Sequence, residues 1–381
     1  MIIGVDIREW QPGVQTGIGR FLEEFLRAAT VARSRDRFLL VGDATCEVRI
    51  QGENIRVVRV PERWTPWWDQ VTLSRTLAAG GADVLYSPYI KVPLLAPVPV
   101  VSTIHDLTFF LKPQYNGYSE ALLLNPPFRL FCKLVVRRAA AILVDSVTSA
   151  RDVQRVLGPD PAKLRVIPLA TSAAFRPKAN GRADAAVWSR YGLTPGYILY
   201  VGGFWPHKNV PCLARAHATL PGRLRTSHPL VMAGGPVSED LQRLVKEPGS
   251  AVRCVGVVPD PDLPALYRGA ALFAFPSGYE GFGLPVLEAM ASGVPVLCST
   301  APALVELTGD AAFHADPEEP AAWERALLLL LEDPDRREML ARRGLARAAS
   351  FRPERMASEI LAVLDEVVAR PGSAGRGTPE C

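Results

Sequence analysis

Short runs of apolar residues alternate along the chain with longer segments in which apolar residues recur at helical spacing. The short runs are apolar at nearly every position, as expected for strands covered on both faces of a parallel sheet. Strands that alternate with helices in this way indicate βαβ units. In the first half, the predicted strands are 2–7, 38–41, 56–60, 84–86, 98–104, 141–144 and 165–167, and the predicted helices are 19–32, 68–79, 125–139 and 149–157.

The same alternation starts again in the second half, so we predict an α/β protein with two doubly wound domains whose ligand lies at the carboxyl ends of the strands. The predicted strands are 198–201, 230–233, 252–255, 272–275 and 295–297, and the predicted helices are 210–220, 238–246, 263–269, 285–292, 320–331, 336–351 and 353–369. We assign the domains to residues 1–172 and 173–352, and we expect helix 353–369 to pack back on the first. A Pro-containing linker is expected at 170–195 and a disordered tail at 370–381.

Composition narrows the class of protein further. The chain has 381 residues, of which 48% are hydrophobic and 22% are charged, which suits two globular cores. A net charge of +4 is too small to indicate a nucleic-acid partner. The six cysteines show no pairing or spacing typical of a metal site, and no metal is expected. Without a signal-peptide pattern or an 18-residue apolar stretch, we expect a cytoplasmic protein.

The most specific motif follows strand 272–275 and reads SGYEGFGLPVLE from residue 277 to residue 288. Its glycines permit a tight turn and a close approach of a ligand to the backbone, and its proline suits the first turn of a helix. N–H groups ahead of such a helix favour an anion. The residues expected to present these groups are Phe282, Gly283 and Leu284, and Gly281 is expected to let the ligand approach the same loop. The flanking carboxylates of Glu280 and Glu288 can accept hydrogen bonds from sugar hydroxyls.

A second loop follows strand 198–201 and reads GGFWPHKN over residues 202–209. Gly203 and the glycine before it give the backbone freedom, and Lys208 offers a positive charge that suits a phosphate. His207 carries a charge only when its imidazole is protonated. We therefore expect Lys208 to contribute more than His207 to phosphate binding.

Two further motifs lie at predicted strand ends in the first half. A Thr-Gly-Ile-Gly-Arg run contains Gly17 and Gly19, but it lacks the third glycine of a dinucleotide fingerprint and the Gly-Lys pair of a P-loop. His105 directly follows the predicted strand 98–104. This position at the carboxyl end of a strand would place its side chain at the ligand site. The neighbouring Asp106 either orients His105 or caps the loop.

These motifs together resemble the retaining GT-B glycosyltransferases of family 4, over roughly residues 1–350. The resemblance implies two Rossmann-like domains that face each other across a cleft, the first for the acceptor and the second for a nucleotide sugar. It also implies that Glu280 contacts the donor sugar, that Glu288 contacts the ribose, and that the amides between them hold the sugar and the diphosphate.

The resemblance assigns the remaining residues as well. Lys208 matches a lysine of the diphosphate-binding loop, whereas His207 stands where arginine is more usual. Gly17 and Gly19 match a loop whose amides approach the donor phosphate, and His105 matches a residue beside the reaction centre. The implied catalytic residues are therefore His105, Lys208 and Glu280.

The implied reaction moves a hexose from a GDP-, UDP- or dTDP-sugar to a saccharide or lipid-linked acceptor, as mannosyl-, rhamnosyl- and glucosyltransferases of bacterial surface polysaccharides do. No cofactor or metal is implied, because the helix dipole and Lys208 would take the place of a metal. Asp260 and Asp262 have the spacing of a metal clamp, but we interpret them as the entry to a helix. The alternatives are a sugar-nucleotide epimerase or phosphorylase, and a non-catalytic scaffold of a polysaccharide assembly complex.

Residues 128–138 form a predicted basic amphipathic helix. It either packs on the core with a solvated basic stripe or docks on a membrane surface, where a lipid-linked acceptor would lie. The second interpretation gives the protein a peripheral position at the cytoplasmic face of the inner membrane.

Overall fold

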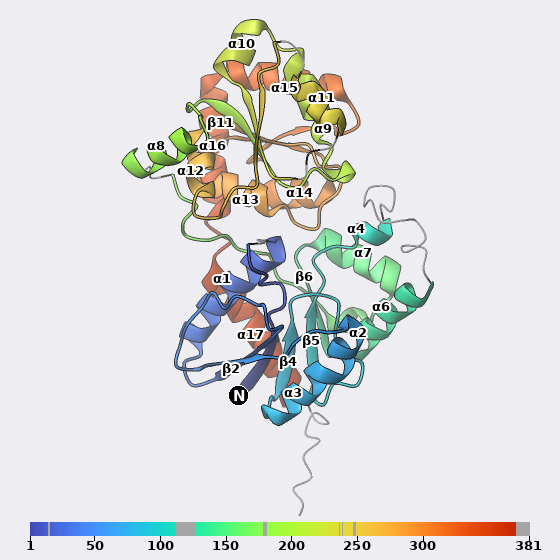
Figure 1. Cartoon of the computed structure of the whole chain (residues 1–381). Helices are drawn as coiled ribbons and strands as arrows, with labels where there is room; N and C mark the ends of the chain where they lie inside the picture. Colours follow the sequence, from blue (N-terminus) through green and yellow to red (C-terminus); the bar gives the residue numbers. More distant parts are fainter. Residues whose placement is uncertain are drawn as a thin grey trace, which may run out of the picture. The chain divides into compact units, whose positions relative to one another are not determined.

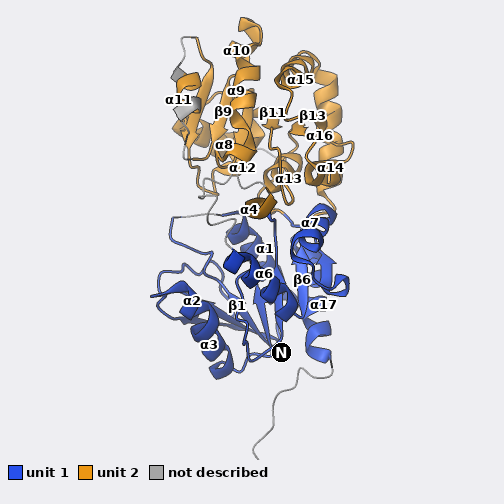
Figure 2. Cartoon of the chain, turned by 90° about the vertical axis from the view of Figure 1, so that its right-hand side faces the viewer, with its two compact units in different colours: residues 1–107, 119–170, 352–381 blue, residues 108–118, 171–351 orange. Residues whose placement is uncertain are grey.

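The computed structural model describes residues 1–13, 16–111, 126–177, 181–235, 237, 239–246 and 249–370. The chain forms two compact units (Figure 2), of which unit 1 holds residues 1–107, 119–170 and 352–381, and unit 2 holds residues 108–118 and 171–351. The change from one unit to the other lies two residues before the predicted boundary. Residues 371–381 of the predicted tail lie outside the described residues.

Unit 1 is built on a seven-stranded parallel sheet of order β3-β2-β1-β4-β5-β6-β7 (Figure 1). The order reverses between β1 and β4, which makes the sheet doubly wound. The strands are β1 (Ile2–Asp6), β2 (Arg37–Gly42), β3 (Ile55–Arg59), β4 (Val84–Ser87), β5 (Val100–Thr103), β6 (Ala141–Val144) and β7 (Leu164–Val166). The described helices are α1 (Gly17–Ala32), α2 (Thr65–Trp67), η1 (Trp68–Thr72), α3 (Leu73–Ala79), α6 (Pro126–Arg138), α7 (Val147–Leu157), η3 (Pro161–Lys163) and α17 (Pro353–Ala369).

The C-terminal helix α17 belongs to unit 1, where it packs against α1 and contacts β4. Its apolar face is buried through Met356, Ile360, Leu364 and Val367. Two further ion pairs hold α17, one between Arg33 and Asp365 and one between Arg165 of β7 and Glu366. The last helix of the chain thus completes the core of the first unit.

Unit 2 contains a six-stranded parallel sheet of order β10-β9-β8-β11-β12-β13, which reverses between β8 and β11. The strands are β8 (Tyr197–Val201), β9 (Leu230–Ala233), β10 (Val252–Gly256), β11 (Ala270–Phe275), β12 (Val296–Ser299) and β13 (Phe313–Ala315). The described helices are α4 (Thr108–Leu111), α8 (Gly181–Arg190), η4 (Pro206–Lys208), α9 (Val210–Ala218), α10 (Gly222–Ser227), α11 (Glu239–Lys246), α12 (Leu263–Gly269), α13 (Leu284–Ala291), α14 (Pro302–Thr308), α15 (Pro320–Glu332) and α16 (Pro334–Ala348). The predicted α/β class with two Rossmann-like sheets is confirmed.

The change of unit at residues 170 and 171 falls within the linker predicted at 170–195, but most of that segment is not a linker, because α8 forms within it and packs against α12. Asp184 is 2% exposed and pairs with Arg268 at 2.6 Å. The indole of Trp188 donates a hydrogen bond of 2.8 Å to the carbonyl oxygen of Ala265. A buried ion pair and one tryptophan hold this helix, so its sequence looks polar although it is packed.

Candidate functional site

The two loops with the strongest motifs leave adjacent strands of unit 2. Loop 202–209 follows β8 and loop 276–283 follows β11, and the strand order reverses between these two strands. Ligands of doubly wound sheets bind outside the carboxyl ends of the strands at this position. The fold therefore brings both motifs to the point where a ligand is expected.

An ion pair joins the two loops. The Nζ atom of Lys208 donates a hydrogen bond of 2.6 Å to Oε1 of Glu280, and the two side chains are 18% and 11% exposed. The ammonium group also lies 5.4 Å from the centre of the Phe275 ring. Partial burial makes the pair stronger than one on an open surface. Lys208 and Glu280, which the sequence singled out separately, thus form one charged centre.

The backbone of loop 202–209 is held in place on both sides of Lys208. His207 is 9% exposed, and its carbonyl oxygen accepts hydrogen bonds from Gly278 N (2.8 Å) and Ser277 Oγ (3.3 Å). Asn209 adopts a left-handed conformation with φ 51° and donates a bond of 2.7 Å from Nδ2 to the carbonyl oxygen of Pro317. These bonds fix the position from which Lys208 reaches Glu280.

The start of the loop rests on an aromatic stack. The hydroxyl of Tyr200 donates a hydrogen bond of 2.6 Å to the carbonyl oxygen of Gly203. The Tyr200 ring stacks on Phe204 and Phe275, with ring centres 5.9 and 5.8 Å apart. Burial raises the pKa of Tyr200 well above its usual range, so the phenol stays a neutral donor. Gly203 thus marks an ordered turn.

Helix α13 begins with open hydrogen-bond donors. Gly283 caps it in a left-handed conformation (φ 106°), and a Cβ atom there would lie 2.4 Å from Leu304 Cδ2, so only glycine fits. The N–H groups of Phe282, Gly283 and Leu284 have no hydrogen-bond partner within the described ranges. Donors of this kind beside a Lys–Glu pair suit a ligand that carries both phosphate and hydroxyl oxygens.

Glu288 lies in the interior of unit 2. Its side chain is 1% exposed, and its Oε2 atom accepts a hydrogen bond of 2.8 Å from the Tyr267 hydroxyl. The Tyr267 ring in turn packs edge-on against Phe175. The structure therefore shows a positioned carboxylate one helical turn inside α13, and its contact with a ribose remains a prediction.

His105 occupies the corresponding edge of unit 1. It follows β5, and its ring reaches the ends of both neighbouring strands. Nδ1 lies 2.8 Å from Oδ2 of Asp145, which follows β6, and Nε2 lies 3.0 Å from the carbonyl oxygen of Pro88, which follows β4. The ring of Phe21, from α1, packs edge-on against the imidazole at 5.1 Å.

The partners of His105 determine its charge. Burial favours the neutral imidazole, but the Asp145 carboxylate and the hydrogen bonds outweigh it and raise the pKa of His105 above its ordinary value. The Pro88 carbonyl can only accept a hydrogen bond, and an ionised Asp145 can only accept another, so protons on both ring nitrogens satisfy both partners. Burial also raises the pKa of Asp145, but the raised pKa of His105 favours the imidazolium beside an ionised Asp145, a form that cannot act as a general base while these bonds persist.

The glycine loop of unit 1 starts helix α1. Thr16 caps this helix, and its Oγ1 accepts a hydrogen bond of 2.9 Å from the N–H group of Gly19. The amide of Gly19 is therefore already engaged in this structure. A Cβ atom on Gly17 would meet nothing within 4 Å, so its surroundings are open. The phosphate contacts of Gly17 and Gly19 remain predictions.

Sequence reasoning missed the residues that hold the predicted ones. Asp145 lies within hydrogen-bond distance of His105, and Tyr267 donates to Glu288. Asp145 could have been identified as a candidate site residue because it directly follows an apolar strand. The same feature identified His105. Asp262 stands at the N-cap position of α12, as its interpretation as a helix entry predicts, and its side chain accepts hydrogen bonds from Arg190 and Tyr191.

The amino-acid sequence is similar to those of known glycosyltransferases. Residues 190–347 match the family model described as "Glycosyl transferases group 1", and residues 16–170 match the "Glycosyl transferase 4-like domain". O-antigen chain mannosyltransferase B of Escherichia coli is 37% identical over 257 residues, which are 66% of this chain and 66% of that protein. D-inositol 3-phosphate glycosyltransferase of Salinispora arenicola (strain CNS-205) is 33% identical over 330 residues, which are 80% of this chain and 73% of that protein.

The fold has close counterparts among solved structures. Anabaena Alr3699/HepE in complex with UDP-glucose superposes with a TM-score of 0.73 at 20% identity, over 96% of this chain and 99% of that chain. At this identity the likeness shows the fold alone. The chain spans about two thirds of the length of the first curated relatives it matches, at 66% and 65%.

Proposed function

Because the chain belongs to the group 1 glycosyltransferase family, we propose that it transfers a hexose from a nucleotide-diphosphate sugar to a saccharide or lipid-linked acceptor, with retention of configuration. The observation that carries the proposal is the Lys208–Glu280 pair beside the open N–H groups of α13. A nucleotide sugar needs a positive site for its diphosphate and acceptors for its sugar hydroxyls. Unit 2 supplies both at one point.

Different residues would stabilise the two opposite charges that develop during the transfer. Negative charge develops on the departing diphosphate, where Lys208 and the N–H groups of residues 282–284 would stabilise it. Positive charge develops on the sugar ring, which the Glu280 carboxylate would face while it accepts bonds from hydroxyls. His105 of unit 1 stays a proposed residue of the reaction centre on the resemblance alone.

The donor is proposed from the relatives. O-antigen mannosyltransferases recur among them, so GDP-mannose is the first donor to test, in the synthesis of a bacterial surface polysaccharide. The UDP-glucose bound to the Anabaena protein makes a UDP-sugar the second.

Nucleotide binding tests the site. We would measure binding of GDP, UDP, dTDP and ADP by calorimetry to the wild type, to Lys208→Ala and to Arg215→Ala, which removes an exposed charge from α9 of the same unit. One nucleotide should bind the wild type and the Arg215 variant alike, and Lys208→Ala should weaken it by about tenfold or more. Equal effects of both substitutions would place the diphosphate elsewhere. Failure of all four nucleotides would favour the scaffold alternative.

Helix α6 supports a membrane-facing position for the acceptor. Cys132, Val135 and Val136 are buried, whereas Leu130 and Leu134 are 57% and 38% exposed. These leucines lie beside a row of exposed basic residues, Arg129, Lys133 and Arg137. Exposed apolar groups next to cations are typical of a helix that lies on an anionic membrane. No helix within the described ranges could cross a bilayer.

Co-sedimentation with vesicles tests this position. Wild type should bind vesicles that contain phosphatidylglycerol more strongly than vesicles of phosphatidylcholine alone, and the paired change Leu130→Ser and Leu134→Ser should abolish the difference. Binding that the pair of substitutions leaves intact would show that α6 is an ordinary solvated helix.

A further inference from the structure

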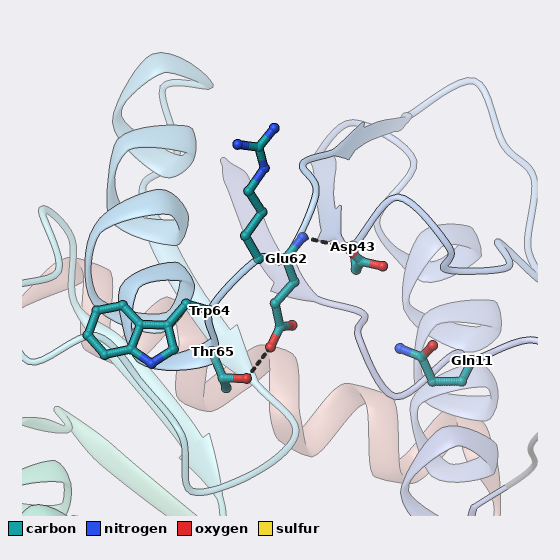
Figure 3. A pocket seen from close by; sticks show the side chains of 6 residues that line it. Gln11, Asp43, Glu62, Trp64 and Thr65 are labelled. Carbon is teal, nitrogen blue, oxygen red and sulfur yellow. Dashed lines mark hydrogen bonds between the residues drawn. The ribbon is translucent and has the colours of Figure 1, made fainter.

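Unit 1 has an open pocket on the half of its sheet away from His105. Its volume is about 460 Å³, within the range of small-molecule sites. Figure 3 shows the indole of Trp64 on one side, Gln11 on the other, and Glu62 and Asp43 between them. The lining residues come from the loops after β1, β2 and β3, and they are Gln11, Asp43, Glu62, Arg63, Trp64 and Thr65.

Trp64 is exposed although the fold does not require it to be. The neighbouring Trp68 fills the core position, with 1% exposure and a hydrogen bond of 3.0 Å from Nε1 to the carbonyl oxygen of Val60. Trp64, at the start of α2, is 64% exposed. A large aromatic side chain kept at the surface beside a pocket indicates a contact surface for a ligand.

The polar wall of the pocket is rigid before any ligand arrives. Asp43 accepts a hydrogen bond of 2.6 Å from the Glu62 backbone N–H, and hydrogen bonds from Thr45 lower the pKa of Asp43 to about 2. Glu62 accepts a bond from Thr65 Oγ1 and a second, of 3.1 Å, from Nη1 of the buried Arg8. Groups fixed in this way lose little entropy when they bind.

The wall of the pocket suits the hydroxyls of a sugar. It is lined by the carboxylates of Asp43 and Glu62 and by Arg63, and Glu62 is paired with the buried Arg8, so the wall has no excess of positive charge that would attract an anionic phosphate. Carboxylates accept hydrogen bonds from hydroxyls, and the guanidinium donates to ring and hydroxyl oxygens. The electron-rich face of an indole attracts the C–H groups of a pyranose ring. The combination fits one sugar residue.

The strand order sets the distance from His105. Asp43 follows β2 and Glu62 follows β3, which lie three and four strands from β5 in the sheet. With strands about 4.8 Å apart, the pocket lies roughly 14 to 19 Å from the strand end that carries His105. One sugar ring cannot span this distance, but a short saccharide can.

We infer that this pocket is a saccharide subsite, in which Trp64 and the Asp43–Glu62 wall hold a sugar of the acceptor several residues from the reacting hydroxyl. The inference rests on the proposed function, because it takes the acceptor to be a saccharide and His105 to mark the reaction centre. A sugar bound in this pocket would make the protein prefer longer saccharide acceptors to shorter ones.

Binding without a donor tests the subsite independently of turnover. Ligand-detected NMR on the full chain would use α-linked mannotetraose at about 10 mM as the probe, with wild type, Trp64→Ala and Trp67→Ala. Trp67 lies on the same helix with 53% exposure but does not line the pocket, which makes it a matched control. Wild type and the Trp67 variant should bind the tetrasaccharide, and Trp64→Ala should weaken binding at least about fivefold. No binding by wild type, or equal losses in both variants, would overturn the inference.

Turnover separates this inference from the proposed function. With GDP-mannose, the wild type should show a lower KM for the octyl glycoside of mannotetraose than for octyl mannoside, and Trp64→Ala should reduce that preference. Arg63→Ala, an exposed side chain, is the second variant if the first misfolds. An unchanged preference in both variants overturns the subsite, whereas tetrasaccharide binding without transfer contradicts only the proposed reaction.

Discussion

Nδ1 of His105 lies 2.8 Å from Oδ2 of Asp145, in a site where the other ring nitrogen faces a backbone carbonyl. With Asp145 ionised both nitrogens donate, so we expect the imidazolium to persist above the ordinary pKa of histidine. NMR titration of the ring protons should show a raised pKa for His105, and Asp145→Asn should lower it. His217 is the internal control, because burial lowers its pKa and Asp145 does not touch it.

The same pair makes stability depend on pH. The folded pKa of His105 is raised above its unfolded value, so its contribution is fully present below the unfolded pKa, about 6.5. It is lost as the pH rises through the folded pKa. The urea midpoint of unit 1 should fall over that window in the wild type, and Asp145→Asn should remove most of the fall. A parallel fall in both proteins would contradict the ion pair.

Glu280→Gln should separate binding from turnover. The carboxylate neutralises Lys208 in the absence of ligand, so its loss should leave the lysine fully available to a diphosphate. We predict that the variant binds nucleoside diphosphate at least as tightly as the wild type, while transfer falls about 100-fold or more. Calorimetry and initial rates measure the two effects. Weaker nucleotide binding would show that Glu280 positions the loop.

Gly283→Ala should damage the start of α13. Its φ of 106° and the 2.4 Å approach to Leu304 leave no room for a methyl group, so we expect a loss of about 2 kcal/mol or more. Gly222→Ala is the control, since a Cβ atom there meets nothing within 4 Å. Denaturant unfolding compares the two variants. Equal stability would mean that α13 relaxes without cost.

Leu364→Ala tests the placement of α17 in unit 1. The side chain is fully buried, so its truncation should cost about 2–5 kcal/mol. Hydrogen exchange should show lower protection in α1 and β4 and unchanged protection in the strands of unit 2. Ser358→Ala, on the exposed side of the same helix, should change neither. A loss of protection confined to unit 2 would contradict the assignment.

The sequence predicted the regular elements well where hydrophobic periodicity decides the structure. Strands 141–144 and 230–233 and helices 263–269 and 353–369 were predicted to the residue. Strand β13 was missed because it is three residues long and includes His314. The helix predicted at 68–79 begins as the π-helical segment η1 and becomes α-helical only from residue 73. No local sequence pattern predicts this π-helical segment.

The candidate site was predicted in part for a similar reason. Lys208, Glu280 and His105 stand near strand ends, which the pattern of apolar runs reveals. Their arrangement depends on residues far away in the chain, such as Asp145, 40 residues beyond His105, and Tyr267, 21 residues before Glu288. Such partners are set by the order of strands in the sheet, so they appear only once the chain is folded.

Detection of the product tests the central claim most directly. Wild-type protein would be incubated with GDP-mannose, UDP-glucose or dTDP-rhamnose and a saccharide acceptor, and the mixture analysed by mass spectrometry and NMR. The account predicts an acceptor heavier by one hexosyl or deoxyhexosyl unit, with the anomeric configuration of the donor, and its loss in Lys208→Ala. An altered donor with an unchanged acceptor would contradict it in favour of an epimerase, and no reaction with any donor would favour a scaffold.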